Sequence, residues 1–165
     1  MVMLLDTSGS MANQVDGYQK IHLALEGVRS AVMAMDKTDQ VSIIGFAEKI
    51  QHDIPLTTDY SSVIRALGRF QPSGGTQMLP ALEQAYLRLQ AASTKEKHLL
   101  ILPAGKSDGN FDPLIQKIVA AQISISTIAI GDVADTFLRS LEIVGQGTYR
   151  HVKNTTQLPR NFVAV

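Results

Sequence analysis

Short apolar runs alternate along the chain with longer segments in which apolar residues recur every three or four positions. An apolar run of strand length is typical of a buried β-strand, whereas the three-to-four spacing places apolar side chains on one face of a helix. Strands that alternate with helices favour βαβ units and a mostly parallel sheet. This alternation constrains the fold more than any other feature and predicts an α/β protein.

The pattern assigns strands and helices to most of the chain. The expected strands are residues 1–5, 41–46, 50–54, 98–102, 123–130 and 148–152. The expected helices are residues 18–35, 60–70, 79–91, 112–121 and 133–144, with a last helix beginning within 157–165. The run 50–54 is more polar and ends at Pro55, so we expect it at a sheet edge, antiparallel to 41–46. The predicted fold is a three-layer, doubly wound, Rossmann-like α/β fold with a mostly parallel six-stranded sheet and one antiparallel edge strand.

Length and composition limit the organisation and the partners. A chain of 165 residues with 45% hydrophobic and 18% charged residues suits one domain, which we take as residues 1–165. Because residues 1–5 already resemble a buried strand, we expect a domain excised from a longer protein. Lys plus Arg and Asp plus Glu both number 15, which argues against a nucleic-acid partner. The absence of Cys excludes disulfides and thiolate metal ligands, and no apolar run approaches the roughly 20 residues that span a membrane.

Oxygen-bearing side chains follow the first predicted strand. The segment Asp6-Thr-Ser-Gly-Ser10 offers one carboxylate and two hydroxyls at alternating positions. Alternate side chains of extended backbone point the same way, so Asp6, Ser8 and Ser10 are expected to converge. Ligands of open α/β sheets bind outside the carboxyl ends of the strands, and hard oxygen donors suit Mg²⁺ or Mn²⁺. A second piece, Ser73-Gly-Gly-Thr76, adds the Thr76 hydroxyl.

The two pieces resemble the von Willebrand factor type A family, whose metal-ion-dependent adhesion site uses Asp-x-Ser-x-Ser, a later Thr and an Asp from a third loop. The segments 39–46, 128–132, 145–149 and 157–160 are also similar to the bacterial pattern of this family, so the resemblance covers nearly the whole chain. The family's last acid follows the fourth strand, within a Thr-Asp-Gly sequence. This chain has Ala104 at that place.

The resemblance implies a binding module rather than an enzyme. A divalent ion, Mg²⁺ or Mn²⁺, would be held by Asp6, Ser8, Ser10 and Thr76 and would coordinate an Asp or Glu of another protein. With Ala104 in place of the acid we expect weak or absent metal binding. Asp108 or Asp112 are possible substitutes for the acid, and the ammonium of Lys106 is a possible substitute for the ion. The parent protein is expected to be a larger bacterial assembly or a membrane-anchored protein.

Other interpretations remain open at this point. Asp6, Ser8 and Ser10, or Thr76, are also favoured caps for the helices that follow them. The domain is alternatively a metal-free scaffold with a degenerate site. A less favoured alternative is a phosphohydrolase that uses Asp6 as its nucleophile, but the second acid of such sites is absent. Ser8 as a nucleophile lacks both the Gly-x-Ser-x-Gly context and a convincing His.

Overall fold

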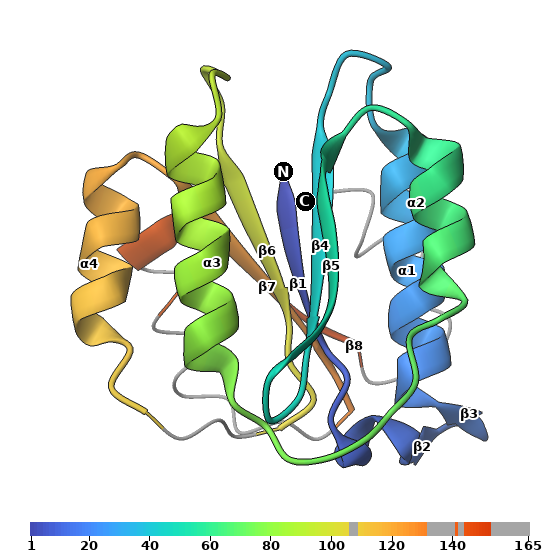
Figure 1. Cartoon of the computed structure of the whole chain (residues 1–165). Helices are drawn as coiled ribbons and strands as arrows, with labels where there is room; N and C mark the ends of the chain where they lie inside the picture. The colour runs from blue at the N-terminus through green and yellow to red at the C-terminus, as the bar shows by residue number, and fades with distance from the viewer. Residues whose placement is uncertain (106–108, 132–140, 142–143, 153–165) are drawn as a thin grey trace.

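A computed structural model of the chain describes residues 1–105, 109–131, 141 and 144–152. One six-stranded sheet in the order β5-β4-β1-β6-β7-β8 forms the middle layer (Figure 1). Its strands are β1 (Val2–Asp6), β4 (Val41–Phe46), β5 (Ile50–Thr57), β6 (His98–Leu102), β7 (Ser124–Ile130) and β8 (Gln146–Val152). The pairings β1–β4, β1–β6, β6–β7 and β7–β8 are parallel, whereas β4–β5 is antiparallel. The predicted fold class is therefore confirmed.

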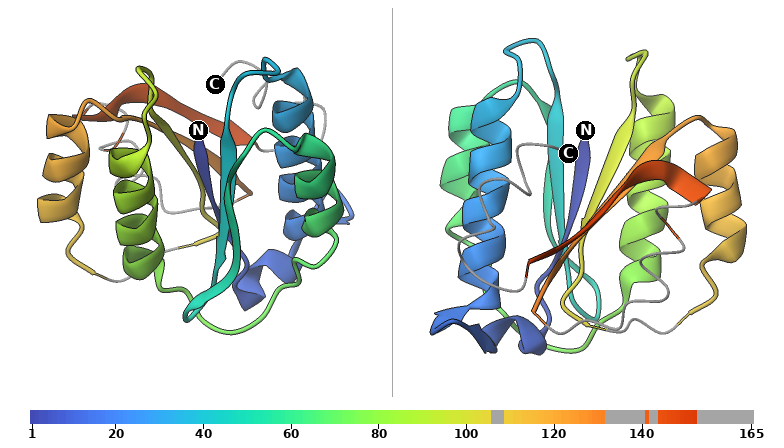
Figure 2. Two further views of the ribbon diagram at one scale, coloured as in Figure 1. Left: turned by 45° about the horizontal axis from the view of Figure 1, so that its top comes forward. Right: turned by 180° about the vertical axis from the view of Figure 1, so that it is seen from behind.

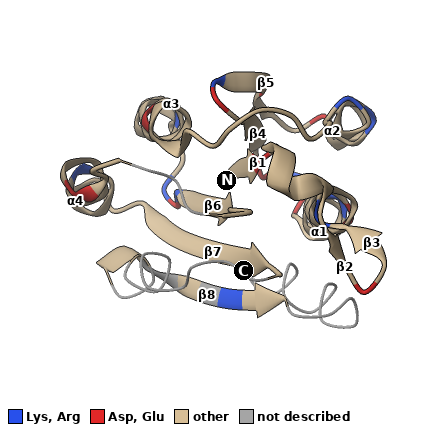
Figure 3. Cartoon of the chain, turned by 90° about the horizontal axis from the view of Figure 1, so that it is seen from below, with Lys and Arg blue, Asp and Glu red and all other residues tan. Residues whose placement is uncertain are grey.

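Helices cover both faces of the sheet. The helices α1 (Lys20–Ala34) and α2 (Tyr60–Leu67) lie on one face, and α3 (Met78–Ala91) and α4 (Asp112–Ala120) lie on the other, as the view along the strands shows (Figure 3). The central strand β1 is buried along its whole length, because apolar side chains from both helical layers pack against it. Two apolar clusters result, one on each face of the sheet.

After the neighbouring strands β1 and β6, the chain turns toward opposite faces of the sheet. The segment after β1 leads to α1 on one face, and the segment after β6 leads to α4 on the other face (Figure 2). Because β1 and β6 are parallel neighbours, their carboxyl ends meet at a topological switch point. In open α/β sheets this is the place where ligands bind.

The edge strand β5 is longer than expected. It continues through Pro55 to Thr57, so the prediction that it ends at residue 54 is wrong. The pairing register shifts between Ile43 opposite Ile54 and Val41 opposite Thr57, and the exposed Pro55 lies in this irregular part. Proline is tolerated there because an edge strand needs no ladder donor on its outer side.

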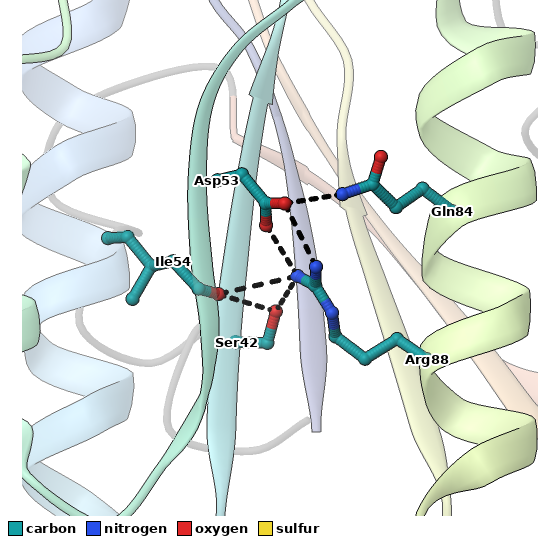
Figure 4. A network of polar contacts seen from close by, with 5 residues as sticks. All are labelled: Ser42, Asp53, Ile54, Gln84 and Arg88. Carbon is teal, nitrogen blue, oxygen red and sulfur yellow. Dashed lines mark hydrogen bonds and ion pairs between the residues drawn. The ribbon is translucent and has the colours of Figure 1, made fainter.

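A polar network joins β5 to the helix layer (Figure 4). The Arg88 guanidinium of α3 donates to both carboxylate oxygens of Asp53, at 2.7 and 3.0 Å. It also donates to Ser42 Oγ of β4 at 2.7 Å, and Gln84 donates to Asp53. A forked Arg–carboxylate pair fixes geometry as well as charge, so this network holds the edge strand against α3.

Two short elements between β1 and α1 were not predicted. A 3₁₀ helix (Gly9–Ala12) is followed by a hairpin of β2 (Gln14–Val15) and β3 (Tyr18–Gln19). The turn residues Asp16 and Gly17 have φ of 50° and 82°, as a two-residue primed turn requires. The helix that follows therefore begins at Lys20 and not at residue 18.

Some expectations lie outside the described residues. They are most of the predicted helix 133–144 and the whole terminal helix within 157–165. In the part of the chain that the structure describes, no helix has both the length and the apolar character needed to cross a membrane.

Candidate metal site at the carboxyl edge of the sheet

The end of β1 is held in place by its neighbour β4. The Thr7 amide donates to the Phe46 carbonyl at 2.7 Å, and the Thr7 hydroxyl donates to the same carbonyl at 2.9 Å. The Thr7 hydroxyl also lies 3.0 Å from Gln51 Oε1 of β5. These bonds extend the parallel pairing one residue beyond Asp6, and they fix the direction in which the Asp6 side chain leaves the strand.

The Asp6 carboxylate is fully buried and bound on both oxygens. Oδ1 accepts from the Ser8 amide at 2.8 Å, and Oδ2 accepts from the Ala104 amide at 3.0 Å. Burial raises the pKa of Asp6 above its ordinary value, and it outweighs the opposing hydrogen bonds from Ser8 and Ala104 and the positive charge of Lys20. The two amides and the Ser8 hydroxyl leave about one of the roughly four acceptor positions of the carboxylate for a cation.

Ser8 lies beside this carboxylate, and Ser10, in the 3₁₀ helix that follows, lies beside Ser8. Their hydroxyls are hydrogen-bonded to each other with the Oγ atoms 3.0 Å apart, and the Ser8 side chain also hydrogen-bonds Asp6. Ser8 occupies the cap position of the 3₁₀ helix, but its side chain makes no capping hydrogen bond. The hydroxyl is turned toward the other oxygen donors instead, which argues against capping as its only role.

The Gly-Gly-Thr loop packs against this segment. The Gly9 amide donates to the Gly74 carbonyl at 2.9 Å, and the Ser73 amide donates to the Thr7 carbonyl at 2.8 Å. Thr76 is half-buried and follows two residues after Gly74, so its loop lies against the serine segment. The cap position of α3 is Gln77, so Thr76 does not occupy it.

The third loop approaches from β6. Ala104 is 3% exposed, and its amide contacts Asp6. A Cβ at Gly105 would lie 3.9 Å from Ser10 Oγ. The loops after β1, β6 and α2 thus meet at one edge. Asp112 is the first residue of α4, whereas Lys106 and Asp108 lie outside the described residues.

Two charged residues near the site were not predicted. Glu48, in the turn between β4 and β5, accepts a 3.2 Å hydrogen bond from the Gly75 amide, and its side chain fills the space that a Cβ at Gly75 would need. Lys20 is buried at the start of α1, and its charge acts on Asp6. Neither residue belongs to a recognisable motif. The position of Lys20 depends on the β2–β3 hairpin, and that of Glu48 depends on the turn between β4 and β5.

The donor set fits a small divalent ion. Two ligands in neighbouring positions of an octahedral Mg²⁺, each about 2.1 Å from the ion, lie roughly 3.0 Å apart. The Ser8 and Ser10 Oγ atoms, which hydrogen-bond to each other, have a separation that would also suit two such ligands. No group of three or more His, Asp or Glu side chains suited to a metal occurs among the residues that the structure describes.

A cavity of about 850 Å³ opens elsewhere, among residues at the amino ends of β1 and β6. Its lining includes Met1, Asp39 and His98 but none of the predicted metal ligands. The oxygen donors after β1 therefore lie at the opposite edge of the sheet from this cavity.

The fold and the loop arrangement define the class of doubly wound α/β domains with a loop cluster at the carboxyl edge of the central strand. The family pattern of the von Willebrand factor type A domain matches residues 1–106, so the chain belongs to this family. Comparison with curated proteins gives no match.

Solved structures agree on the fold. The conserved hypothetical protein BatB from Bacteroides thetaiotaomicron is 18% identical with a TM-score of 0.83, over 99% of this chain and 94% of that one. An aerotolerance-related membrane protein from Bacteroides fragilis is 17% identical with a TM-score of 0.82, over 98% and 94%. The pilus adhesin SpaC from Lactobacillus rhamnosus GG is 14% identical with a TM-score of 0.73, and this chain covers 29% of it. Identities this low show the fold alone.

Proposed function

We propose that this chain is a protein-interaction module that holds a weakly bound Mg²⁺ or Mn²⁺ at the carboxyl edge of its sheet. The oxygen donors are Asp6, Ser8, Ser10 and Thr76. When bound, the ion supplies an open coordination position for an Asp or Glu carboxylate of a partner protein. The observation that supports the proposal is the row of oxygen atoms in which the Ser10 hydroxyl contacts the Ser8 hydroxyl at 3.0 Å and Ser8 contacts the buried Asp6 carboxylate.

Weak binding follows from the charges. Only Asp6 among the proposed donors is anionic, and each of its oxygens already accepts a backbone N–H. A second carboxylate roughly 4 Å from the ion would add several kcal/mol of attraction at an effective dielectric of about 20, before desolvation is subtracted. Ala104 supplies no such charge, so the affinity is expected in the millimolar range.

Calorimetric titration with Mg²⁺ and Mn²⁺ tests the metal site. The unaltered chain should bind at millimolar concentration or not measurably, Ala104→Asp should bind at least tenfold more tightly, and Ser8→Ala should weaken the binding of Ala104→Asp. Ser61→Ala, an exposed serine of α2, is the matched control. Micromolar binding by the unaltered chain contradicts a weak site. No binding by any variant favours the metal-free scaffold.

Partners and location are proposed on similar grounds. The family consists largely of interaction and adhesion modules, and one structural neighbour is described as a pilus adhesin. Another is described as a membrane protein, which supports a bacterial, membrane-anchored parent. A capture experiment in which a partner is eluted by EDTA, and is not retained by Ser8→Ala/Ser10→Ala, would support metal-dependent docking.

A phosphohydrolase is the less favoured function. A nucleophilic carboxylate must reach the phosphorus atom, but Asp6 is fully buried and both of its oxygens are bound by amides. Hydrolysis of p-nitrophenyl phosphate with Mg²⁺ that disappears in Asp6→Ala would support the enzyme. Equal background rates for the two proteins support the binding module.

A further inference from the structure

The β4–β5 hairpin contains an extra residue beside the candidate metal site. Two consecutive residues of β4, Gly45 and Phe46, pair with His52 and Ile50 of β5. Gln51 lies between these two partners and has no counterpart in β4, so it forms a β-bulge. A bulge redirects the extra side chain from its place in the regular alternation, and bulges are frequent next to functional sites. The direction of the Gln51 side chain is therefore a feature of this bulge.

The Gln51 amide joins two loops of the candidate site. One end lies 3.0 Å from the Thr7 hydroxyl, and the other end donates to Ser73 Oγ at 2.8 Å. A primary amide has an acceptor at one end and donors at the other, so a single side chain can serve both hydroxyls. Thr7 belongs to the segment 6–10 and Ser73 to the loop 73–76. Gln51 thus bridges the two segments that contain all four proposed oxygen donors.

The same hairpin holds Thr76 from both sides. The Gly75 amide donates to Glu48 at 3.2 Å, and the Gln77 amide donates to the Ala47 carbonyl at 2.7 Å. The turn between β4 and β5 and the loop before α3 lie together at this edge of the sheet (Figure 1). Because both neighbours of Thr76 are bound to one turn, the hairpin sets the place of this residue. Hydrogen bonds of this kind hold ligand-bearing loops in a productive geometry.

The loop is bound on its other side by the serine segment. The Ser73 amide donates to the Thr7 carbonyl at 2.8 Å, and the Gly9 amide donates to the Gly74 carbonyl at 2.9 Å. Loss of the Gln51 bridge should loosen these contacts more than it destabilises the whole fold. The Thr7 hydroxyl keeps the Phe46 carbonyl as its acceptor, and water can reach the exposed Ser73.

We propose that Gln51 is a positioning residue that holds the Gly-Gly-Thr loop against the serine segment and so sets the geometry of the oxygen donors before an ion arrives. The link between the two loops needs no metal, whereas its effect on ion affinity rests on the proposed function. Mg²⁺ demands a nearly ideal octahedral arrangement, and ligands held in place beforehand need no ordering when the ion binds. A loosened loop therefore lowers the affinity, although Gln51 is not itself a ligand.

Amide hydrogen exchange measured by NMR in EDTA tests the link without any metal. Gln51→Met keeps nearly the same length and lacks both hydrogen-bonding groups. The Gly9 and Ser73 amides should exchange about fivefold faster or more, while the Leu100 amide of the central strand β6 should change less than about twofold. Tm should fall by only about 2–4 °C, since one partly exposed bridge is lost. Gln116→Met, an exposed glutamine of α4, is the matched control and should leave these amides unchanged.

A second variant removes the bridge from its other end. Ser73→Ala changes an exposed residue, so it should fold even if Gln51→Met does not, and it should accelerate exchange of the Gly9 amide in the same way. Unchanged exchange at Gly9 in both variants would overturn the proposal. Equal acceleration at Gly9 and Leu100 would show a general loss of stability and would also overturn it.

Metal titration by calorimetry in the Ala104→Asp background tests the effect on affinity. Gln51→Met should weaken Mn²⁺ binding about fivefold, and Gln116→Met should change it less than about twofold. If Gln51 acts by placing the loop of Thr76, then Thr76→Ala should weaken binding on its own but add less than about twofold to Gln51→Met.

The outcomes separate this inference from the metal site on which it partly rests. Fully additive effects of Gln51→Met and Thr76→Ala, or unchanged affinity in Gln51→Met, would overturn the positioning role while the metal site stands. Absence of Mn²⁺ binding even in Ala104→Asp would overturn the proposed metal site and the effect on affinity together. Hydrogen exchange in EDTA would then still decide whether Gln51 links the two loops.

Discussion

Ala104→Asp changes the charge at the centre of the loop cluster, and its effect can be worked out from one contact. The Ala104 amide lies 3.0 Å from Asp6 Oδ2, and the residue is 3% exposed. A carboxylate on this side chain would lie roughly 5 Å from that of Asp6, where two unit charges repel by about 3 kcal/mol at an effective dielectric of about 20. For a chain of this size, Tm falls by about 2–4 °C per kcal/mol, so the metal-free variant should melt roughly 6–12 °C lower.

A divalent ion should reverse this loss. Ligand at 100 times its dissociation constant stabilises the folded state by about 2.7 kcal/mol, which nearly offsets the repulsion. The assay is thermal unfolding in EDTA and in a series of Mn²⁺ concentrations. Ala104→Asn is the matched control, since it has similar volume and no charge. If Ala104→Asp and Ala104→Asn melt together in EDTA and neither responds to Mn²⁺, residue 104 does not face Asp6 and the reasoning is wrong.

Three further outcomes are expected from other parts of the molecule. Arg88→Ala removes the forked pair with the half-exposed Asp53 and should cost about 1–2 kcal/mol by denaturant unfolding, whereas the exposed Arg65→Ala should cost less than about 0.5. In the Ala104→Asp background, Glu48→Ala frees the Gly75 amide and should weaken Mn²⁺ binding severalfold by calorimetry, whereas Glu48→Gln, which keeps an accepting oxygen, should retain most of it. Burial lowers the pKa of His98 to about 4, so the unfolded state protonates first. Stability is kept above about pH 6.5 and falls by up to about 3 kcal/mol toward pH 4, and this slope should flatten in His98→Gln.

The parts of the fold that were predictable have strong local patterns. The strands 41–46 and 98–102 have the predicted bounds, because a mostly apolar run leaves little freedom in where a strand begins and ends. The predicted edge strand ends too early, at residue 54. Proline is tolerated where a strand lacks a neighbour on one side, and the sequence alone does not show which side that is. The hairpin was overlooked although Asp16-Gly17 is a strong turn signal, since Gln14 and Gln19 give its strands no apolar alternation.

The candidate site likewise contains some residues that the sequence predicts and others that it does not. Ser8 contacts Asp6 and Ser10 contacts Ser8, but Ser10 lies in the 3₁₀ helix and not on the extended backbone from which their convergence is predicted. Lys20 was not foreseen as part of the site. Its burial depends on the hairpin that turns it inward and on the bare backbone of Gly131, which is 111 positions away in sequence. Such long-range packing has no local signal in a single sequence.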